Sequence, residues 1–158
     1  MTREQFITQV KATQKAFRRF LVALCCGDSQ LADDIAQEAY MKSYLALDTI
    51  EDDAKFKSWL FRIGYNTFIS NRRSEHPCAN LDQVAETASP KLSDDRFRYE
   101  ALYRALDRLT PKERTTILLF YMEGYSVKEI ADIENIAQTT ARQYLCRGRF
   151  HLKDLLEN

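Results

Sequence analysis

The sequence has few residues that break helices: its 158 residues include only four Gly and three Pro. So few breaks favour long helices over the many tight turns of a sheet protein. No apolar run approaches the length that crosses a membrane, and the first residues show no signal-peptide pattern. These absences predict an all-α protein that lies in the cytoplasm and makes no membrane contact of its own.

Cysteine and histidine are also scarce. The cysteines are Cys25, Cys26, Cys78 and Cys146. They show neither the paired spacing of zinc ligands nor a disulfide framework, so we expect reduced thiols, with a redox role as the less favoured alternative. His76 and His151 have no nucleophile–base pair and no phosphate-binding glycine loop to accompany them. An enzyme is therefore disfavoured, and neither a metal nor a cofactor is expected.

The formal net charge is zero, yet the charges are segregated along the chain. Residues 28–53 hold many acids and Lys42 as their only base, whereas residues 55–73 and 138–153 hold bases and no acid. One acidic and two basic segments indicate separate surfaces for separate partners. Solvated helix faces are the plainer alternative that charge alone leaves open.

Apolar residues recur at helical spacing in two stretches of the chain. The first stretch predicts three amphipathic helices, with a break at Gly27, a cap at Asp28 or Ser29, and a polar loop at residues 48–54. Between the stretches, about twenty residues show no period, and such a length is unusual inside one compact domain. We therefore expect two small helical domains, residues 1–74 and 96–158, joined by a flexible linker at 75–95.

The second stretch carries the signals of a helix-turn-helix. Thr110-Pro111 followed by Glu113 predicts a capped helix start, because the Thr hydroxyl can accept from the third helical amide. Ser126 followed by Glu129 repeats this signal. Asn135 falls where the chain must reverse, and Asn tolerates a left-handed conformation. Together with the apolar spacing around them, these residues predict two short helices packed across a tight turn.

The helix after this turn is basic and begins with hydrogen-bonding side chains. Such groups can contact base edges in a major groove, while later bases suit phosphates. The predicted base-contacting residues are Gln138, Thr139, Arg142 and Gln143, and the predicted phosphate-contacting residues are Arg147, Arg149 and Lys153. An ordinary helical hairpin with a solvated basic face is the less favoured alternative.

The first stretch predicts two further surfaces. Residues 33–44 mix carboxylates with Tyr and Met, which suits an Arg-rich protein partner, although a solvated face beside core aromatics is what this helix alone favours. Residues 57–73 interleave bases, amides and aromatics, which can stack on unpaired bases while Lys and Arg hold the strand. We expect Trp59 and Ile63 in the core. The residues expected to be exposed are Phe61, Arg62, Tyr65, Asn66, Arg72 and Arg73.

Five segments in order resemble one family over nearly the whole chain apart from the linker. They are residues 32–40, 56–66, 106–114, 124–131 and 140–149. The chain resembles an extracytoplasmic-function (ECF) sigma factor of the sigma-70 family. The resemblance implies a subunit that directs core RNA polymerase to specific promoters and initiates transcription.

The resemblance also implies roles for particular residues. Asp34, Gln37, Glu38 and Met41 would dock on the clamp helices of the β′ subunit. The loop at residues 50–56 and the basic helix with Lys57, Arg62, Asn66, Arg72 and Arg73 would recognise and open the minus-ten element. The helix-turn-helix would read the minus-thirty-five element through Gln138, Thr139, Thr140, Arg142, Gln143, Arg147 and Arg149. Leu119 and Phe120 would lie near the β flap, and an anti-sigma factor is a further implied partner.

Some residues depart from the family pattern. Asn135 stands where the family commonly has Gly, and Gln143 and Tyr144 stand where Ser and Arg are frequent, so the promoter sequence is not predicted. A stand-alone helix-turn-helix regulator is the alternative function, but it leaves residues 34–38 and 59–66 unexplained. Because each domain is small and its core marginal, we expect the two to pack together in solution, through faces meant for polymerase or an anti-sigma factor.

Overall fold

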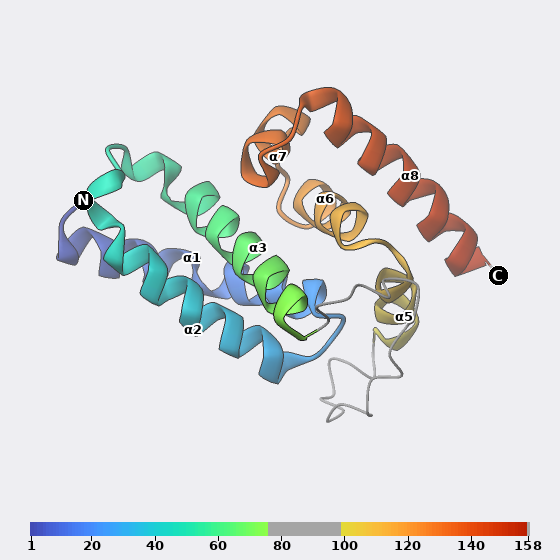
Figure 1. The fold of residues 1–158 in the computed structure, drawn as a ribbon, viewed down its shortest axis with the longest axis horizontal. Coiled ribbons are helices and arrows are strands. Elements are labelled where there is room, and N and C mark those ends of the chain that lie inside the picture. The colour runs from blue at the N-terminus through green and yellow to red at the C-terminus, as the bar shows by residue number, and fades with distance from the viewer. Residues whose placement is uncertain (76–98, 158) are drawn as a thin grey trace.

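The computed structural model describes residues 1–75 and 99–157, and all regular secondary structure in these ranges is helical (Figure 1). The α-helices are α1 (Arg3–Leu24), α2 (Ser29–Leu45), α3 (Phe56–Glu75), α5 (Glu100–Arg108), α6 (Pro111–Tyr121), α7 (Val127–Glu134) and α8 (Gln138–Glu157). Two 3-10 turns, η1 (Leu47–Thr49) and η2 (Asp53–Lys55), lie between α2 and α3. The prediction of an all-α fold is confirmed in the described ranges. The predicted linker lies outside them, apart from Glu75 at the end of α3.

Helices α1, α2 and α3 form the first half of the molecule around an aromatic core. Phe17, Phe20 and Phe61 are fully buried in it. The rings of Phe17 and Phe61 meet edge-on, with centroids 5.4 Å apart. A Cβ atom at Gly64 of α3 would come 2.6 Å from Cε1 of Phe17. Glycine at this position therefore lets α3 lie close to α1.

The junction between α1 and α2 forms where the sequence predicts it. Gly27 has a φ of 92°, a conformation that glycine adopts without a steric penalty. Asp28 is the N-cap of α2, and its carboxylate accepts a hydrogen bond from the Leu31 amide at 3.0 Å. The predicted break at Gly27 and the Asp28 cap are both confirmed.

Cys25 and Cys26 lie at this junction. Burial raises the pKa of both thiols, that of Cys26 to about 11. Since the thiolate is the reactive form, such thiols are weak nucleophiles. Cys25, Cys26 and Cys146 are free, and Cys78 lies outside the described residues.

Helices α5 to α8 form the second half, and both predicted helix starts are present in it. The Thr110 hydroxyl accepts from the Glu113 amide at 3.2 Å, and Ser126 forms a capping box with Glu129. The Glu113 side chain does not complete a capping box, in which it would accept from the main-chain amide of Thr110. One carboxylate oxygen accepts from the Thr110 hydroxyl at 3.0 Å, and the other lies 3.0 Å from His151 Nδ1. The Glu113 side chain therefore links the start of α6 to α8.

The turn between α7 and α8 has the predicted left-handed residue. Asn135 has φ 56° and ψ 53°, and its amide and that of Ile136 donate back to main-chain oxygens of α7. This arrangement satisfies carbonyl groups that the end of a helix leaves without partners. The prediction of a helix-turn-helix with Asn135 at the reversal is confirmed.

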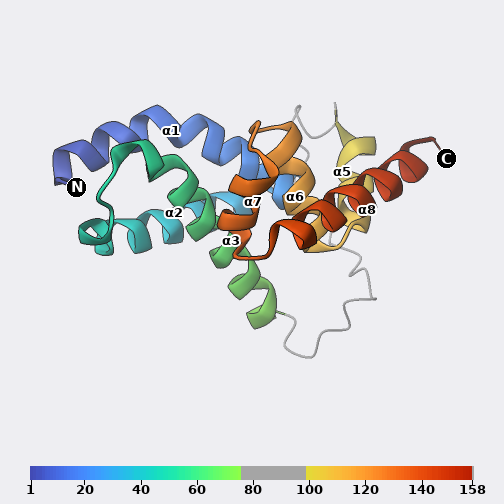
Figure 2. The same ribbon diagram turned by 90° about the horizontal axis from the view of Figure 1, so that it is seen from above.

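The two halves pack on each other, with α6 beside α1 and α7 beside α3 (Figures 1 and 2). The buried apolar side chains of both halves belong to one cluster. Contact between the halves agrees with our expectation for two small units with marginal cores. The faces in contact belong to α1 and α3, whereas the predicted polymerase-binding residues of α2 stay exposed.

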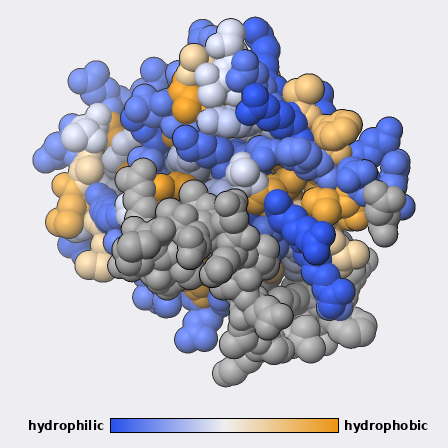
Figure 3. Space-filling model, turned by 45° about the vertical axis from the view of Figure 1, so that its right-hand side comes forward, coloured by the Kyte–Doolittle hydropathy of each residue, from blue (hydrophilic) through white to orange (hydrophobic). Residues whose placement is uncertain are grey.

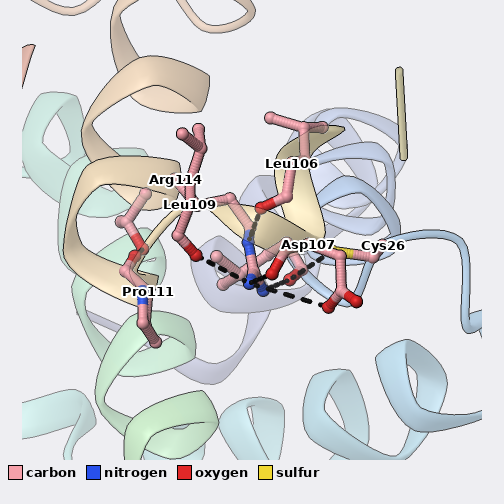
Figure 4. A network of polar contacts seen from close by, with 8 residues as sticks. Cys26, Leu106, Asp107, Leu109, Pro111 and Arg114 are labelled. Carbon is pink, nitrogen blue, oxygen red and sulfur yellow. Dashed lines mark hydrogen bonds and ion pairs between the residues drawn. The ribbon is translucent and has the colours of Figure 1, made fainter. Parts of the chain in front are cut away.

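A buried arginine also joins the halves (Figure 4). Arg114 of α6 donates to the main-chain oxygens of Leu106 and Leu109 in the second half, at 2.8 and 3.3 Å. Its Nη1 donates to the main-chain oxygen of Leu24, the last residue of α1, at 2.8 Å. One guanidinium therefore supplies donors to carbonyl groups at the ends of two helices, where a positive charge is also favourable.

Candidate nucleic-acid interface

Helix α8 buries one narrow stripe and exposes most of its other side chains. The buried stripe consists of Ala141, Leu145 and Gly148, which recur at helical spacing. The exposed predicted DNA-binding residues are Gln138, Thr139, Arg142, Gln143, Arg147 and Arg149, and Thr140 is half-buried. The structure therefore places the predicted contact residues of α8 at the surface of the helix that follows the turn.

Gly148 was not predicted to have a role, and it sets how closely α8 approaches α6. A Cβ atom at this position would come 2.7 Å from Cγ1 of Ile117. The signal was present in the sequence, because an isolated glycine inside a helical pattern indicates close packing. Gly148 thus helps to fix the position of α8 on the second half.

The side chain of Arg149, unlike a fully solvated base, is held by contacts with α6. Its Nε donates to the hydroxyl of Tyr121, and its guanidinium carbon lies 5.3 Å from the ring centroid of Phe120 and 5.4 Å from that of Tyr121. Cation–π contacts of this kind hold the side chain against α6. Leu119 was expected near a protein partner, but it is fully buried and belongs to the cluster of buried apolar side chains that both halves share.

A buried carboxyl group supports the helix-turn-helix from inside. Glu134 at the end of α7 is 7% exposed, and its Oε2 accepts from the Thr116 hydroxyl at 2.8 Å. Burial raises the pKa of Glu134 to about 7, against the opposing effects of the Thr116 hydrogen bond and Lys112. This carboxyl group therefore changes its protonation state near neutral pH.

Helix α3 exposes fewer of its predicted contact residues than α8 does. Arg62 and Asn66 are exposed one turn apart, and Lys57 at the start of the helix is half-buried. Arg72 is half-buried, with its guanidinium carbon 5.8 Å from the ring centroid of Phe68. Burial and the nearby charge of Arg114 lower its pKa. The side chain of Arg73 lies outside the described residues.

Two aromatic residues of α3 were wrongly expected at the surface. Phe61 is fully buried and Tyr65 is 6% exposed. With Phe68 they recur at positions i, i+4 and i+7, so they form the stripe that packs into the core of the first half. Trp59 and Ile63, expected in the core, are half-buried and pack against it. The surface of α3 therefore offers cations and an amide rather than a row of stacking rings.

The acidic helix α2 presents the four predicted polymerase-binding residues on one exposed strip. Asp34, Gln37, Glu38 and Met41 are spaced i, i+3, i+4 and i+7, and the Met41 side chain is 67% exposed. Glu38 pairs with Lys42 at 3.3 Å. The strip continues into exposed apolar residues at the end of the helix, Tyr44 and Leu45. Such a mixture of carboxylates and apolar groups is typical of a protein-binding surface.

Other exposed apolar residues are Ile7 of α1 and, on the second half, Tyr99, Leu102, Tyr121, Phe150 and Leu156. Figure 3, in which the side of α5 and α8 is turned forward, shows apolar groups scattered among hydrophilic ones.

Within residues 1–75 and 99–157, no cluster of three or more His, Cys, Asp and Glu side chains could hold a metal ion. No helix in these ranges is long and apolar enough to span a bilayer.

Both halves match models of one class of transcription factor. Residues 9–77 match sigma-70 region 2, and residues 99–152 match sigma-70 region 4. The fold, the exposed helix-turn-helix and these two matches define a sigma factor of the sigma-70 class. The boundaries that we predicted at residues 74 and 96 stay predictions.

Similar curated proteins show which family of sigma factors the chain belongs to. The chain is 33% identical to the ECF RNA polymerase sigma factor SigW of Bacillus subtilis, over 84% of this chain and 79% of the relative. It is 32% identical to the RNA polymerase sigma-H factor of Pseudomonas aeruginosa, over 82% and 75%. The chain belongs to the ECF family of RNA polymerase sigma factors. A stand-alone regulator is not favoured by these matches.

Solved structures support the same fold. The sigma factor RpoE from Bartonella quintana, in complex with the anti-sigma factor NepR, matches with a TM-score of 0.76 and 26% identity over 96% of both chains. CnrH in complex with the cytosolic domain of CnrY matches with a TM-score of 0.72 and 22% identity, over 96% of this chain and 87% of that one. The second likeness shows the fold alone.

Proposed function

We propose that this sigma factor divides its work among three exposed surfaces on three helices. The strip of α2 binds core polymerase, α3 contacts the minus-ten element, and α8 reads the minus-thirty-five element. The observation that carries this proposal is the placement of the predicted residues of α2 and α8 on separate exposed faces. The role follows from family membership, whereas the assignment of each surface follows from exposure and charge.

Helix α8 suits a major groove. Its first turn offers Gln138 and Thr139, and the next turn offers Arg142 and Gln143, all exposed and able to donate hydrogen bonds to base edges. The first helical bond of α8 runs from the Ala141 amide to the Ala137 oxygen, and Ala137 has no side-chain acceptor for the first amides. A DNA phosphate supplies such an acceptor.

Helix α3 suits a strand of the minus-ten element. Arg62 and Asn66 share an exposed face, and Lys57 stands near the exposed loop at residues 51–55. Lysine and arginine attract the phosphate backbone, and an amide can bond to an unpaired base. Since Phe61 and Tyr65 are buried, polar contacts carry recognition on this helix.

The strip of α2 suits the basic surface of a polymerase subunit. Asp34 and Glu38 supply negative charge, and Met41 supplies an exposed apolar contact beside them. Complementary charge speeds association, and the apolar group adds buried area once the surfaces meet. The β′ clamp helices are the proposed site, and the β flap is a second contact through the second half.

The remaining partners follow from the same role. A factor that works with polymerase on DNA acts in the cytoplasm as a non-catalytic subunit. The similar structure of the sigma factor RpoE contains a bound partner, the anti-sigma factor NepR. We include an anti-sigma factor among the partners of this chain, and the exposed apolar residues of both halves offer surface for it.

Reconstituted transcription tests the proposal. Purified core polymerase with this chain is expected to initiate at a subset of promoters in a genomic library, and core polymerase alone is not. In a pull-down, the double variant D34K/E38K should lose core binding. The double variant E4K/E157K makes the same charge change at exposed acids outside α2 and should retain it. Full retention by D34K/E38K contradicts the docking surface.

A further inference from the structure

The loop between α6 and α7 reaches into the first half of the molecule. Glu123 lies in this loop, and its side chain is only 1% exposed. Its Oε1 is 3.3 Å from Nη2 of Arg19 on α1, and its Oε2 is 3.5 Å from Nζ of Lys57 on α3. A single buried carboxylate of the second half thus pairs with two cations of the first.

Tyr125 completes the contact at the start of α3. Its ring meets the ring of Phe61 edge-on, with centroids 5.9 Å apart. The ammonium of Lys57 lies 5.9 Å from the Tyr125 centroid and 5.7 Å from the Phe61 centroid. Lys57 therefore faces one carboxylate and two aromatic rings.

These are the kinds of contact that a DNA strand offers to a basic side chain: an anionic oxygen and a flat ring. We infer that the α6–α7 loop, residues 122–126, occupies the start of α3 in place of promoter DNA and holds the free sigma factor in a closed form. This inference rests on the proposed role of α3 in binding the minus-ten element. DNA and the loop compete for Lys57, so the second half must leave α3 before the strand can bind there.

Two features of this contact between the loop and α3 reduce the free energy needed to open it. Within the described residues, the hydroxyl of Tyr125 has no hydrogen-bond partner, and Oε2 of Glu123 has the ion pair with Lys57 at 3.5 Å but no hydrogen bond. Buried polar atoms without such partners regain hydration when a contact opens, which reduces the free energy of opening. Opening also releases Arg114 from the Leu24 oxygen, but the bonds of Arg114 to Leu106 and Leu109 remain inside the second half.

Charge reversal in the loop tests the closed form without polymerase. E123K places a third cation beside Arg19 and Lys57, so the halves should separate. D132K makes the same charge change at an exposed residue of α7 and serves as the control. Small-angle X-ray scattering should show a larger radius of gyration for E123K than for D132K and the unmodified chain, with helix content by circular dichroism unchanged.

A labelled single-stranded DNA of mixed sequence measures the masking of α3. By fluorescence anisotropy at low salt, E123K should bind this strand about tenfold more tightly than D132K, which carries the same net charge. An unchanged radius of gyration overturns the closed form. If the halves of E123K separate but E123K and D132K bind the strand with equal affinity, the loop and DNA do not compete.

A gentler pair of variants guards against misfolding of E123K. Arg18 and Arg19 are neighbours with 57% and 58% exposed side chains, but Arg18 pairs with Asp33 inside the first half and Arg19 pairs with Glu123 across the halves. R19Q should bind the strand about twofold more tightly than R18Q, which loses the same charge. Equal binding overturns the inference. These readouts need no polymerase, so failure of reconstituted transcription with all variants contradicts the proposed function and leaves the closed form standing.

Discussion

Helices α3 and α8 carry similar charge patterns, yet the fold uses them differently. Each contains a segment with bases and no acid, residues 56–73 of α3 and residues 138–153 of α8. Helix α8 packs through a narrow stripe and exposes its bases, whereas α3 packs against its own half and also beside α7 of the second half. The two helices differ in exposure because the aromatic residues of α3 are buried in the core. A basic segment therefore indicates a basic surface only where little of the helix is needed for the core.

The strongest test of how the halves are joined is the removal of Arg114. Arg114→Met keeps the volume but leaves the oxygens of Leu24, Leu106 and Leu109 without their buried donor. We expect the free energy of unfolding to fall by about 3 kcal/mol. Urea unfolding followed by circular dichroism measures it. A loss below about 1 kcal/mol would show that these carbonyl groups find other donors.

A second test concerns the buried acid beneath α8. The pKa of Glu134 is raised to about 7, so between its unfolded value of 4.5 and 7 the folded chain holds a proton that the unfolded chain has lost. Stability should therefore fall as pH rises through this window, by about 2 kcal/mol. Glu134→Gln keeps a neutral acceptor for Thr116 and should remove this dependence.

The measurement for Glu134→Gln is the denaturant midpoint at pH 5 and at pH 8. The variant should match the unmodified chain at pH 5 and exceed it at pH 8. Asp132→Asn, at an exposed acid on the same helix, is the control and should leave the pH dependence in place. An unmodified chain that is equally stable at both pH values contradicts the prediction.

Alanine substitution at the two helical glycines tests how tightly α3 and α8 pack against their neighbours. An alanine methyl at Gly64 meets the fully buried ring of Phe17, and one at Gly148 meets Ile117. Alanine gains about 1 kcal/mol of helix propensity over glycine, but overpacking costs about 1–3 kcal/mol. We expect Gly64→Ala to lower stability by about 1–2 kcal/mol and Gly148→Ala by less, measured by thermal unfolding. The reverse order would show that α8 has the tighter interface.

The smallest expected effects separate the two DNA contacts. Arg142→Ala should weaken binding of a promoter duplex by about fivefold, since it removes one side chain near the start of α8. Arg62→Ala should leave duplex binding nearly unchanged and weaken binding of single-stranded DNA in the E123K background. Anisotropy titrations of both variants on both probes measure this. Equal losses on both probes would contradict the division of work between the helices.

The features that the sequence predicts well are local ones. The caps at Asp28, Thr110 and Ser126 and the reversal at Asn135 depend on neighbouring residues, so spacing along the chain reveals them. The exposed strip of α2 was likewise predictable, because helical periodicity separates its buried and exposed residues.

The features that were missed depend on distant partners. Phe61 was expected at the surface because it lies in a segment that interleaves bases, amides and aromatics, whereas its burial depends on Phe17 and Phe20 of α1. The roles of Glu123 and Arg114 lie in contacts across about a hundred residues of chain, the hydrogen bonds to Arg19 and Leu24 spanning 104 and 90 positions. No local pattern marks such pairings.

The single cluster of buried apolar side chains has a consequence for the lifetime of the protein in the cell. A half that has parted from the other carries uncovered apolar surface, and such surface attracts proteases, chaperones and other copies of the chain. The chain is therefore most open to degradation and aggregation after the two halves part and before a binding partner covers their apolar surfaces. Turnover of the factor should follow how fast polymerase takes it up, so that idle molecules are removed first.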